Sequence, residues 1–362
     1  MRYLFNLLTP IIILALVSLS LFLLNERQIF DIRTLVRIDP VPHTQELIDQ
    51  KQYADAYEYL NYFMAYEYVQ SDPKAQALSH HIDEVRSSYD YKSDKILEGI
   101  LKGTSDETEG QISAIASDFL VVGDIRDLAI QGTLFAKDEE VDTVIVALST
   151  LGLVATASTL YSFGATTPVK GTLSLLKYGK RVGKLPNWLN KQLIREAKVA
   201  KETKSLSKVQ EVLKPITDLY EKVGMKQTLD LLKQTKNLDD LKGIVKFSFR
   251  FGKESSILLK TTKNQARYYA KAMPNVTNRE FLYAATYGER GLQGLKRLGV
   301  SKFMKRTKIA ANLSKTIYKG NLDALLTYLL KTIPTTLLYG IVLLGLLYFS
   351  RKFVRIYWKI FN

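Results

Sequence analysis

Two long apolar segments, one near each end of the sequence, restrict this chain more than any other feature. Residues 4–24 carry no charged side chain, and a helix of that length rises about 30 Å, the thickness of the hydrocarbon core of a bilayer. A second uncharged run covers residues 332–350, and the apolar residues before it extend the predicted span to 325–350. Lys331 lies within that span, close enough to its edge for the ammonium group to reach the interface. The two segments predict a membrane protein with a transmembrane helix near each terminus.

The flanks of these segments refine the prediction. A cleaved signal peptide has a shorter apolar stretch followed by small residues, whereas residues 4–24 end in Leu23-Leu24 and are followed by Asn25-Glu26-Arg27. We therefore expect an uncleaved anchor. After residue 350, cations alternate with aromatic side chains, as they do at membrane interfaces. The predicted interfacial residues in this tail, 351–362, are Arg351, Lys352, Arg355, Tyr357, Trp358 and Lys359.

Charge divides the rest of the sequence into two halves. Residues 25–142 hold 11 Lys/Arg against 24 Asp/Glu, and residues 143–350 hold 35 Lys/Arg against 12 Asp/Glu. The basic half could bind anionic lipid headgroups, dock on the acidic half or bind nucleic acid. Lipid is the favoured interpretation beside membrane segments, and nucleic acid is unlikely. The absence of cysteine excludes disulfides and thiolate metal sites.

A third uncharged stretch covers residues 143–169 and is rich in serine, threonine and small residues. Pro168 breaks it, so residues 140–185 are predicted to form an apolar helical hairpin. This hairpin could be a buried core element, a re-entrant segment or a membrane-spanning one. Its second arm carries further residues expected at lipid headgroups, namely Lys177, Lys180, Arg181 and Lys184.

The remaining sequence has helical periodicity throughout, so the expected fold class is all-α: a membrane-anchored helical bundle. Residues 25–43 form a linker that ends in the extended Asp39-Pro40-Val41-Pro42. An acidic helical domain follows at 44–139, and a basic helical bundle at 186–320. Within the acidic domain, Asp72-Pro73 begins one long amphipathic helix that reaches Gly103.

The acidic domain is unusually rich in tyrosine. Residues 44–78 contain a tyrosine opening a helix, alanines able to pack between helices and a closing proline, and in this they resemble a tetratricopeptide-type hairpin. More aromatic rings are present than one core face absorbs, so the excess is a candidate partner surface: Tyr53, Tyr57, Tyr59, Tyr62, Tyr66 and Tyr68. The run DFLVVGDIRDL at 118–128 resembles uncharacterised bacterial inner-membrane proteins, a resemblance that implies no activity.

No set of residues predicts catalysis, a metal site or a cofactor. His80 and His81 diverge on a helix, and His43 lies in the proline-containing linker. Asp124 and Asp127 have the spacing of residues that complement a helix dipole. The glycines in residues 288–294 are expected to allow close helix packing, and the phenylalanines in residues 246–251 are expected to pack from a helix end into the core or onto the membrane interface.

The sequence therefore predicts a non-enzymatic scaffold or protein-interaction subunit of a bacterial envelope complex in the inner membrane. If only two helices span, both termini share one side, and we expect cytoplasmic termini with a periplasmic body. The alternative is a membrane-perturbing or pore-forming protein that inserts the hairpin at 140–185. A protein partner and anionic lipids are the expected ligands.

Overall fold

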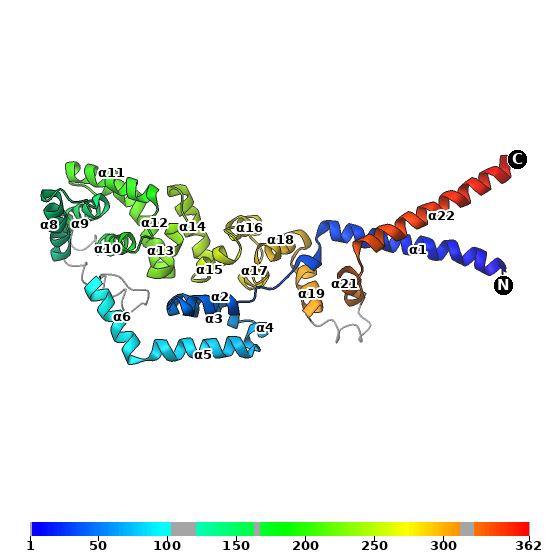
Figure 1. The fold of residues 1–362 in the computed structure, drawn as a ribbon. Helices are drawn as coiled ribbons and strands as arrows, with labels where there is room; N and C mark the ends of the chain where they lie inside the picture. Colours follow the sequence, from blue (N-terminus) through cyan, green and yellow to red (C-terminus); the bar gives the residue numbers. More distant parts are fainter. Residues whose placement is uncertain (1, 103–120, 163–166, 312–321, 362) are drawn as a thin grey trace. The chain divides into compact units, whose positions relative to one another are not determined.

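The computed structural model describes residues 2–102, 121–162, 167–311 and 322–361, and within these ranges the chain forms helices and their connections, with no β-strand (Figure 1). The chain divides into two compact units. Unit 1 combines residues 1–38 with residues 261–362, and unit 2 consists of residues 39–260. The predicted all-α class is confirmed.

Unit 1 combines two segments of the sequence, one that precedes unit 2 in the chain and one that follows it. The N-terminal segment supplies α1 (Arg2–Ile29) and the short 3₁₀ helix η1 (Ile32–Thr34). The C-terminal segment supplies α16 (Ala266–Ala272), α17 (Asn278–Ala285), α18 (Gly288–Leu298), α19 (Val300–Ala311), α21 (Leu322–Thr332) and α22 (Thr335–Phe361).

Unit 2 holds the acidic half together with the first part of the basic half. Its first helices are α2 (Val41–Asp49), α3 (Tyr53–Met64), α4 (Glu67–Gln70), α5 (Pro73–Ser87), α6 (Tyr89–Lys102) and α8 (Val121–Ala136). They are followed by α9 (Thr143–Ser162), α10 (Thr167–Arg181), α11 (Asn187–Thr203), α12 (Ser207–Val223), α13 (Met225–Lys233), α14 (Leu238–Phe251) and α15 (Glu254–Thr261).

This division differs from the consecutive domains expected from the sequence. The predicted basic bundle, 186–320, is divided between residues 260 and 261, so that its first part lies in unit 2 with the acidic helices and its second part lies in unit 1. The reason is that α1 packs against α22, so the helices adjoining α22 join the N-terminal segment in one unit. The predicted linker is also shorter than expected, because α1 reaches Ile29 and α2 already begins at Val41.

Two helices that were predicted to be continuous are broken. The expected span 325–350 is interrupted before Pro334, so α21 ends at Thr332 and α22 begins at Thr335. Proline disfavours helical geometry in the residue before it, which explains the break. The expected helix from Pro73 to Gly103 is interrupted at Ser88, whose ψ of 145° is extended and which separates α5 from α6.

Helix α9, the uncharged arm of the predicted hairpin, lies in the core of unit 2. It packs against α8, α10 and α11, and its side chains Leu148, Leu151 and Ala155 are fully buried. Helix α10 is buried over residues 172–179. The apolar side chains of α9 are therefore buried against neighbouring helices of unit 2.

The glycine-rich and phenylalanine-rich segments also have packing roles. A Cβ at Gly291 would collide with the backbone oxygen of Ala284, and one at Gly294 would collide with Phe30 and Phe303. Phe247 and Phe251 are buried in α14, whereas Phe249 is exposed. Both observations confirm the packing expected from the sequence, with Phe249 as the exception.

Candidate membrane anchor and ligand site

The N-terminal and C-terminal helices of unit 1, α1 and α22, lie side by side and run in opposite directions, so that their outer ends point the same way (Figure 1). Their contact is close at Gly345, where a Cβ would collide with Val17 and would touch Ile13. Each helix contains a segment long and apolar enough to cross a membrane, Leu8–Ile29 in α1 and Thr335–Arg355 in α22. The two segments have 22 and 21 residues, which correspond to a rise of about 32 Å.

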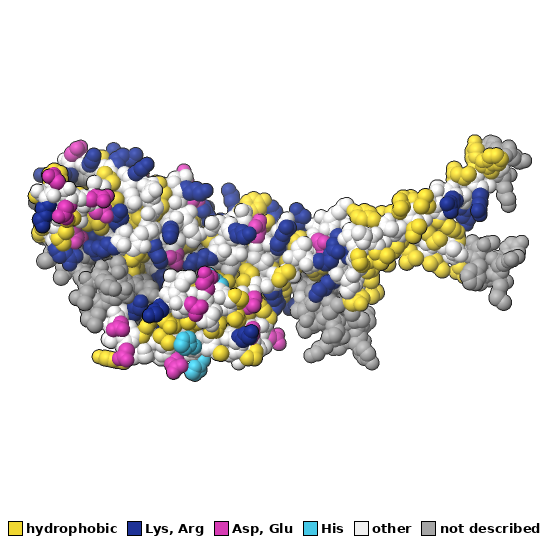
Figure 2. Space-filling view, viewed as in Figure 1, with side chains coloured by type: hydrophobic (Ala, Val, Ile, Leu, Met, Phe, Trp, Pro, Cys, Tyr) yellow, Lys and Arg dark blue, Asp and Glu magenta, His cyan; other side chains and the backbone are white. Residues whose placement is uncertain are grey.

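Most of the apolar surface of this helix pair is not covered by protein. Only 22% of the most apolar part of α1 and 11% of that of α22 is buried. Leu14, Leu343 and Leu344 each expose more than half of their surface, at 57%, 61% and 67%, and hydrophobic side chains cover much of the visible face of the pair in Figure 2. Apolar patches of this extent are typical of membrane or protein contact surfaces.

Arg27 joins the two helices at their inner end. Its guanidinium group donates to the backbone oxygens of Leu330, at 2.8 Å, and Ile333, and to the Thr335 hydroxyl, at 3.2 Å. The last carbonyl groups of a helix have no partner within the helix, and the break at Pro334 leaves those of α21 in this state. A cation from α1 therefore caps the C-terminus of α21.

Two further polar contacts fix the same region. Arg306 of α19 is buried and donates to Glu26 at 2.6 Å. Arg33 binds Asp31 and also donates to the Thr335 hydroxyl at 2.9 Å. The hydrogen bond from Arg33 keeps the pKa of Asp31 below its ordinary value. The inner end of the helix pair is thus held by charged groups, while its length is apolar.

The predicted basic and aromatic tail continues α22 without a break as far as Phe361. Arg351, Lys352 and Arg355 are exposed, and so are Tyr357 and Trp358, at 54% and 66%. The side chain of Lys359 lies outside the described residues. These exposed residues place cations and aromatic groups together at the outer end of an apolar helix.

The four basic residues expected on the hairpin are paired within unit 2. Lys177 is buried and donates to Asp124, at 2.6 Å, and to Asp127, at 3.0 Å. The other three also pair with carboxylates: Lys180 with Asp142 at 3.3 Å, Arg181 with Asp127 at 3.3 Å and Lys184 with Asp230 at 2.7 Å. Because Lys177 is enclosed by protein, its ammonium group cannot reach a lipid headgroup in this structure.

Asp124 and Asp127 therefore have a role that their spacing alone did not predict. They lie on α8 and bind the ammonium group from α10 in the interior of unit 2. Burial raises the pKa of Asp124, although the Lys177 ammonium opposes that shift. The Asp124 carboxylate lies against Gly152 of α9, where a Cβ would collide with it. The sequence places these two carboxylates beside an uncharged helix, where a buried charge requires a partner, but it does not identify Lys177 as that partner.

The acidic and basic halves contact each other in unit 2. The Lys226 ammonium group of α13 lies 2.6 Å from Asp55 and 2.7 Å from Glu58 of α3. Gln227 also donates to Glu58, at 2.8 Å. Burial opposes the charge on Lys226, but the two carboxylates outweigh it and raise its pKa. Part of the charge asymmetry along the sequence is thus used for contacts inside the protein.

The six tyrosines do not form one exposed surface. Tyr62 is buried, which raises its pKa, and its ring contacts Phe63 and Tyr66. Tyr59 packs against His43 with ring centroids 4.7 Å apart. Tyr53, Tyr59, Tyr66 and Tyr68 are half-buried, and among the six only Tyr57 is exposed, at 39%.

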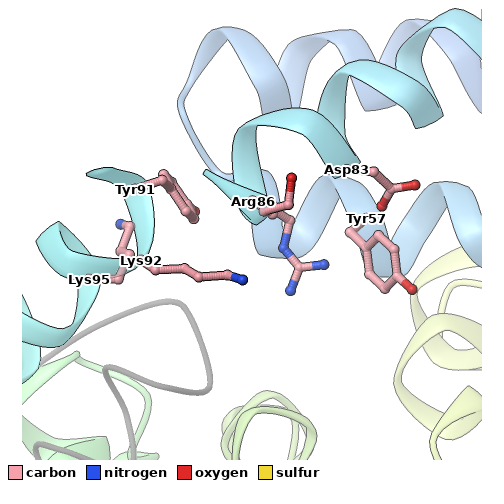
Figure 3. Close-up of a pocket in the computed structure, with 7 residues that line it drawn as sticks. Tyr57, Asp83, Arg86, Tyr91, Lys92 and Lys95 are labelled. Carbon is pink, nitrogen blue, oxygen red and sulfur yellow. The ribbon is translucent and has the colours of Figure 1, made fainter. Parts of the chain in front are cut away.

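Tyr57 borders a pocket of about 320 Å³ at the break between α5 and α6. The pocket is lined by Tyr57, Asp83, Arg86, Ser87, Tyr91, Lys92 and Lys95 (Figure 3). The Arg86 guanidinium lies over the Tyr57 ring, 4.4 Å from its centroid, and the Lys95 ammonium lies 5.5 Å from the centroid of Tyr91. The pocket could not be predicted from the sequence, because it depends on the break at Ser88.

Searches against protein-family models, curated proteins and solved structures found no match to this chain.

Proposed function

We propose that this protein is a non-enzymatic, membrane-anchored scaffold or interaction subunit of a bacterial envelope complex. The antiparallel pair of α1 and α22 supports this proposal, because it presents uncovered apolar surface along its length and cations with aromatic groups at one end. Two antiparallel helices that each cross a bilayer once leave both termini on the same side of the membrane. Unit 2 is then the part that meets partners.

The basic tail supports an orientation with both termini in the cytoplasm and unit 2 in the periplasm. Arg351, Lys352 and Arg355 follow directly on the apolar part of α22, within the distance over which the positive-inside rule acts. Together with Tyr357 and Trp358, they are the residues that we assign to the anionic headgroups.

We assign α9 to the core of unit 2 and not to a third span. Inserting it into a bilayer would require its separation from α8, α10 and α11. It would also separate the Lys177 ammonium from its two carboxylates or carry the three charges into hydrocarbon, and each choice is costly. This arrangement argues against pore formation by the hairpin.

Reporter fusions test the two-span arrangement. Alkaline phosphatase, which is active only in the periplasm, and a fluorescent protein that folds in the cytoplasm would each be fused after residues 37, 135, 210 and 362. The fusions after 37, 135 and 210 are expected to report the periplasm, and the fusion after 362 the cytoplasm. Opposite results at 135 and 210 would show that α9 spans the membrane and would refute this arrangement.

Recovery of the full chain with a partner tests the scaffold role. The tagged protein would be purified from membranes in mild detergent, with or without prior cross-linking, and its mass measured by light scattering. A defined complex larger than one chain in its micelle is expected. A chain that stays monomeric and without partners after cross-linking in cells would refute the proposal.

A further inference from the structure

The outer face of α11 is strongly basic. In residues 187–208, which comprise α11 and the start of α12, every cation is exposed: Lys191, Arg195, Lys198, Lys201, Lys204 and Lys208. Of the two carboxylates in the same stretch, Glu196 is buried and only Glu202 is exposed. Figure 2 shows the Lys and Arg side chains along this part of unit 2.

These lysines are not neutralised by neighbouring carboxylates. The Arg195 guanidinium lies 3.5 Å from Glu196, but within the described residues no carboxylate forms an ion pair with any of the five lysines of this stretch. The predicted hairpin differs, because each of its four basic residues is paired with a carboxylate. The positive charge that unit 2 can offer to a partner therefore lies on α11 and not on the hairpin.

The cations lie on one side of the helix. Lys191, Arg195 and Lys198 follow one another at spacings of four and three residues, which places them on a single face. Lys201 extends this row, so that it covers a rise of about 15 Å. The opposite face consists of buried Leu189, Leu193, Ala197 and Ala200, and α11 packs against α9 and α12. The basic face is thus held outward by the core.

A contact of this face with a partner would be electrostatic. Among the described residues of α10 to α13, no large apolar side chain is exposed. Interfacial helices that insert into a bilayer do so with an apolar face, and the apolar face of α11 is already buried in unit 2. A row of exposed cations without a pocket fits an extended anionic surface.

We propose, on the basis of the membrane anchor proposed above, that the outer face of α11 binds the anionic headgroups of the same bilayer. Unit 2 is joined covalently to both anchor helices through the two segments of unit 1, so headgroups are present at a high effective concentration. Six cations with one exposed carboxylate match the charge of such a surface. The contact would orient unit 2 on the membrane for its role as a scaffold.

Fluorescence quenching in proteoliposomes tests this proposal on the full chain. The sequence contains no cysteine, so Asn187→Cys provides a single labelling site on α11, one turn before Lys191. Ala77→Cys provides the control label on α5, which lies at the opposite edge of unit 2 (Figure 1). The bilayer contains a phospholipid with a spin label on its headgroup, which quenches fluorophores that it contacts. The label at residue 187 should be quenched in mixed phosphatidylcholine and phosphatidylglycerol, and much less in phosphatidylcholine alone.

Removing the cations should remove the quenching. A cation close to an anionic surface contributes about fivefold to binding. The combined variant Lys191→Gln, Lys198→Gln, Lys201→Gln should therefore lower the ratio of docked to undocked unit 2 by roughly 100-fold. High salt should have the same effect on the chain that retains these lysines. The matched control is Lys233→Gln, Lys236→Gln, Lys242→Gln, which removes three exposed lysines outside α11 and should keep the quenching.

The outcomes separate this contact from the anchor. Equal quenching of the label at residue 187 in neutral and anionic bilayers, equal quenching at residue 77, or equal loss in the two triple variants would overturn the proposal. Quenching that persists in the α11 variant, together with loss of a protein that cross-links to α11 in cells, would replace the bilayer by an acidic protein. A chain that fails to float with the vesicles would refute the anchor itself, whereas a floating chain with an unquenched label refutes only the contact of α11.

Discussion

Replacing Lys177 by methionine should destabilise unit 2 severely at neutral pH. The ammonium group lies 2.6 Å from Asp124 and 3.0 Å from Asp127. The exposed fractions of the three side chains are 2%, 12% and 6%, so water cannot replace the lost cation. Removing one partner of a buried ion pair typically costs about 3–5 kcal/mol. The free energy of unfolding should fall by about that amount.

The loss should shrink as the pH is lowered. Burial already raises the pKa of Asp124, and Lys177 is a group that opposes this shift, so the variant should raise the pKa further. A carboxyl with a raised pKa in the folded state binds protons more tightly there than in the unfolded chain. It therefore makes the folded state less stable as the pH rises through that pKa and more stable as the pH falls. Between neutral pH and pH 3.8, the ordinary pKa of aspartate, the variant should recover part of its deficit.

The fluorescence of Trp188 provides the assay. Trp188 and Trp358 are the two tryptophans of the chain, and the Trp188 indole donates to Thr235 in unit 2 at 3.0 Å. In a Trp358→Phe background, urea unfolding in micelles would therefore report unit 2. Lys180→Met is the control, since Lys180 and Asp142 are 30% and 34% exposed and 3.3 Å apart, and such pairs contribute about 0.2–1 kcal/mol. Equal costs for the two variants at neutral pH would refute the reasoning.

Three further results are expected from the packing and the ion pairs. Cysteines in place of Val17 and Gly345 should form a disulfide on oxidation in membranes, because a Cβ at residue 345 would lie 3.6 Å from that of Val17 and disulfides need about 3.5–4.5 Å. Gly291→Ala should lower the free energy of unfolding of unit 1 by about 1–3 kcal/mol, as measured by urea unfolding, because the added methyl group meets a backbone oxygen of the preceding helix. Lys226 has a raised pKa, so its two ion pairs stabilise unit 2 fully below pH 10.5, the ordinary lysine pKa, and this contribution is lost as the pH rises through the folded pKa. Lys226→Gln should therefore reduce the loss of stability above that pH in alkaline unfolding curves.

Each of these results has a matched control. Leu344 faces away from protein, at 67% exposed, so a cysteine there should cross-link with one at residue 17 much more slowly. Gly132→Ala should not destabilise, because nothing lies within 4 Å of its Cβ position. Lys233→Gln removes an exposed lysine from the same helix as Lys226 and should leave the alkaline transition unchanged. A control that behaves like its test variant would contradict the corresponding contact.

The helical class and the two apolar helices could be predicted because each depends on local sequence. The length of an uncharged run of about 20 residues can be counted directly in the sequence and compared with the thickness of a bilayer. The spacing of apolar residues likewise indicates the helical period. The break at Pro334 was also present in the sequence. The apolar residues on both sides of the proline favour one continuous span, whereas the proline disfavours helical geometry at Ile333.

The contacts between distant segments could not be predicted in this way. Lys177 follows its partner Asp124 by 53 residues, and nothing near Lys177 distinguishes it from the lysines that lie on the surface. The same limit applies to Lys226, and to the pocket, where a change of direction at Ser88 brings α6 and α3 around one space. Burial of a charge depends on which helices meet, and local periodicity does not carry that information.

The pairing of α1 with α22 also sets an order for synthesis of the protein. Val17 and Gly345 are 328 residues apart in the sequence, which at about 5–20 residues per second is a delay of roughly 15–65 s. During that time Arg27 lacks the carbonyl groups that it binds in the finished protein. Unit 2 is complete in the chain well before α22 emerges from the ribosome, so it can fold first. Helix α1 must therefore persist without its partner, and a chain terminated early would carry a folded unit 2 on a single, unpaired helix.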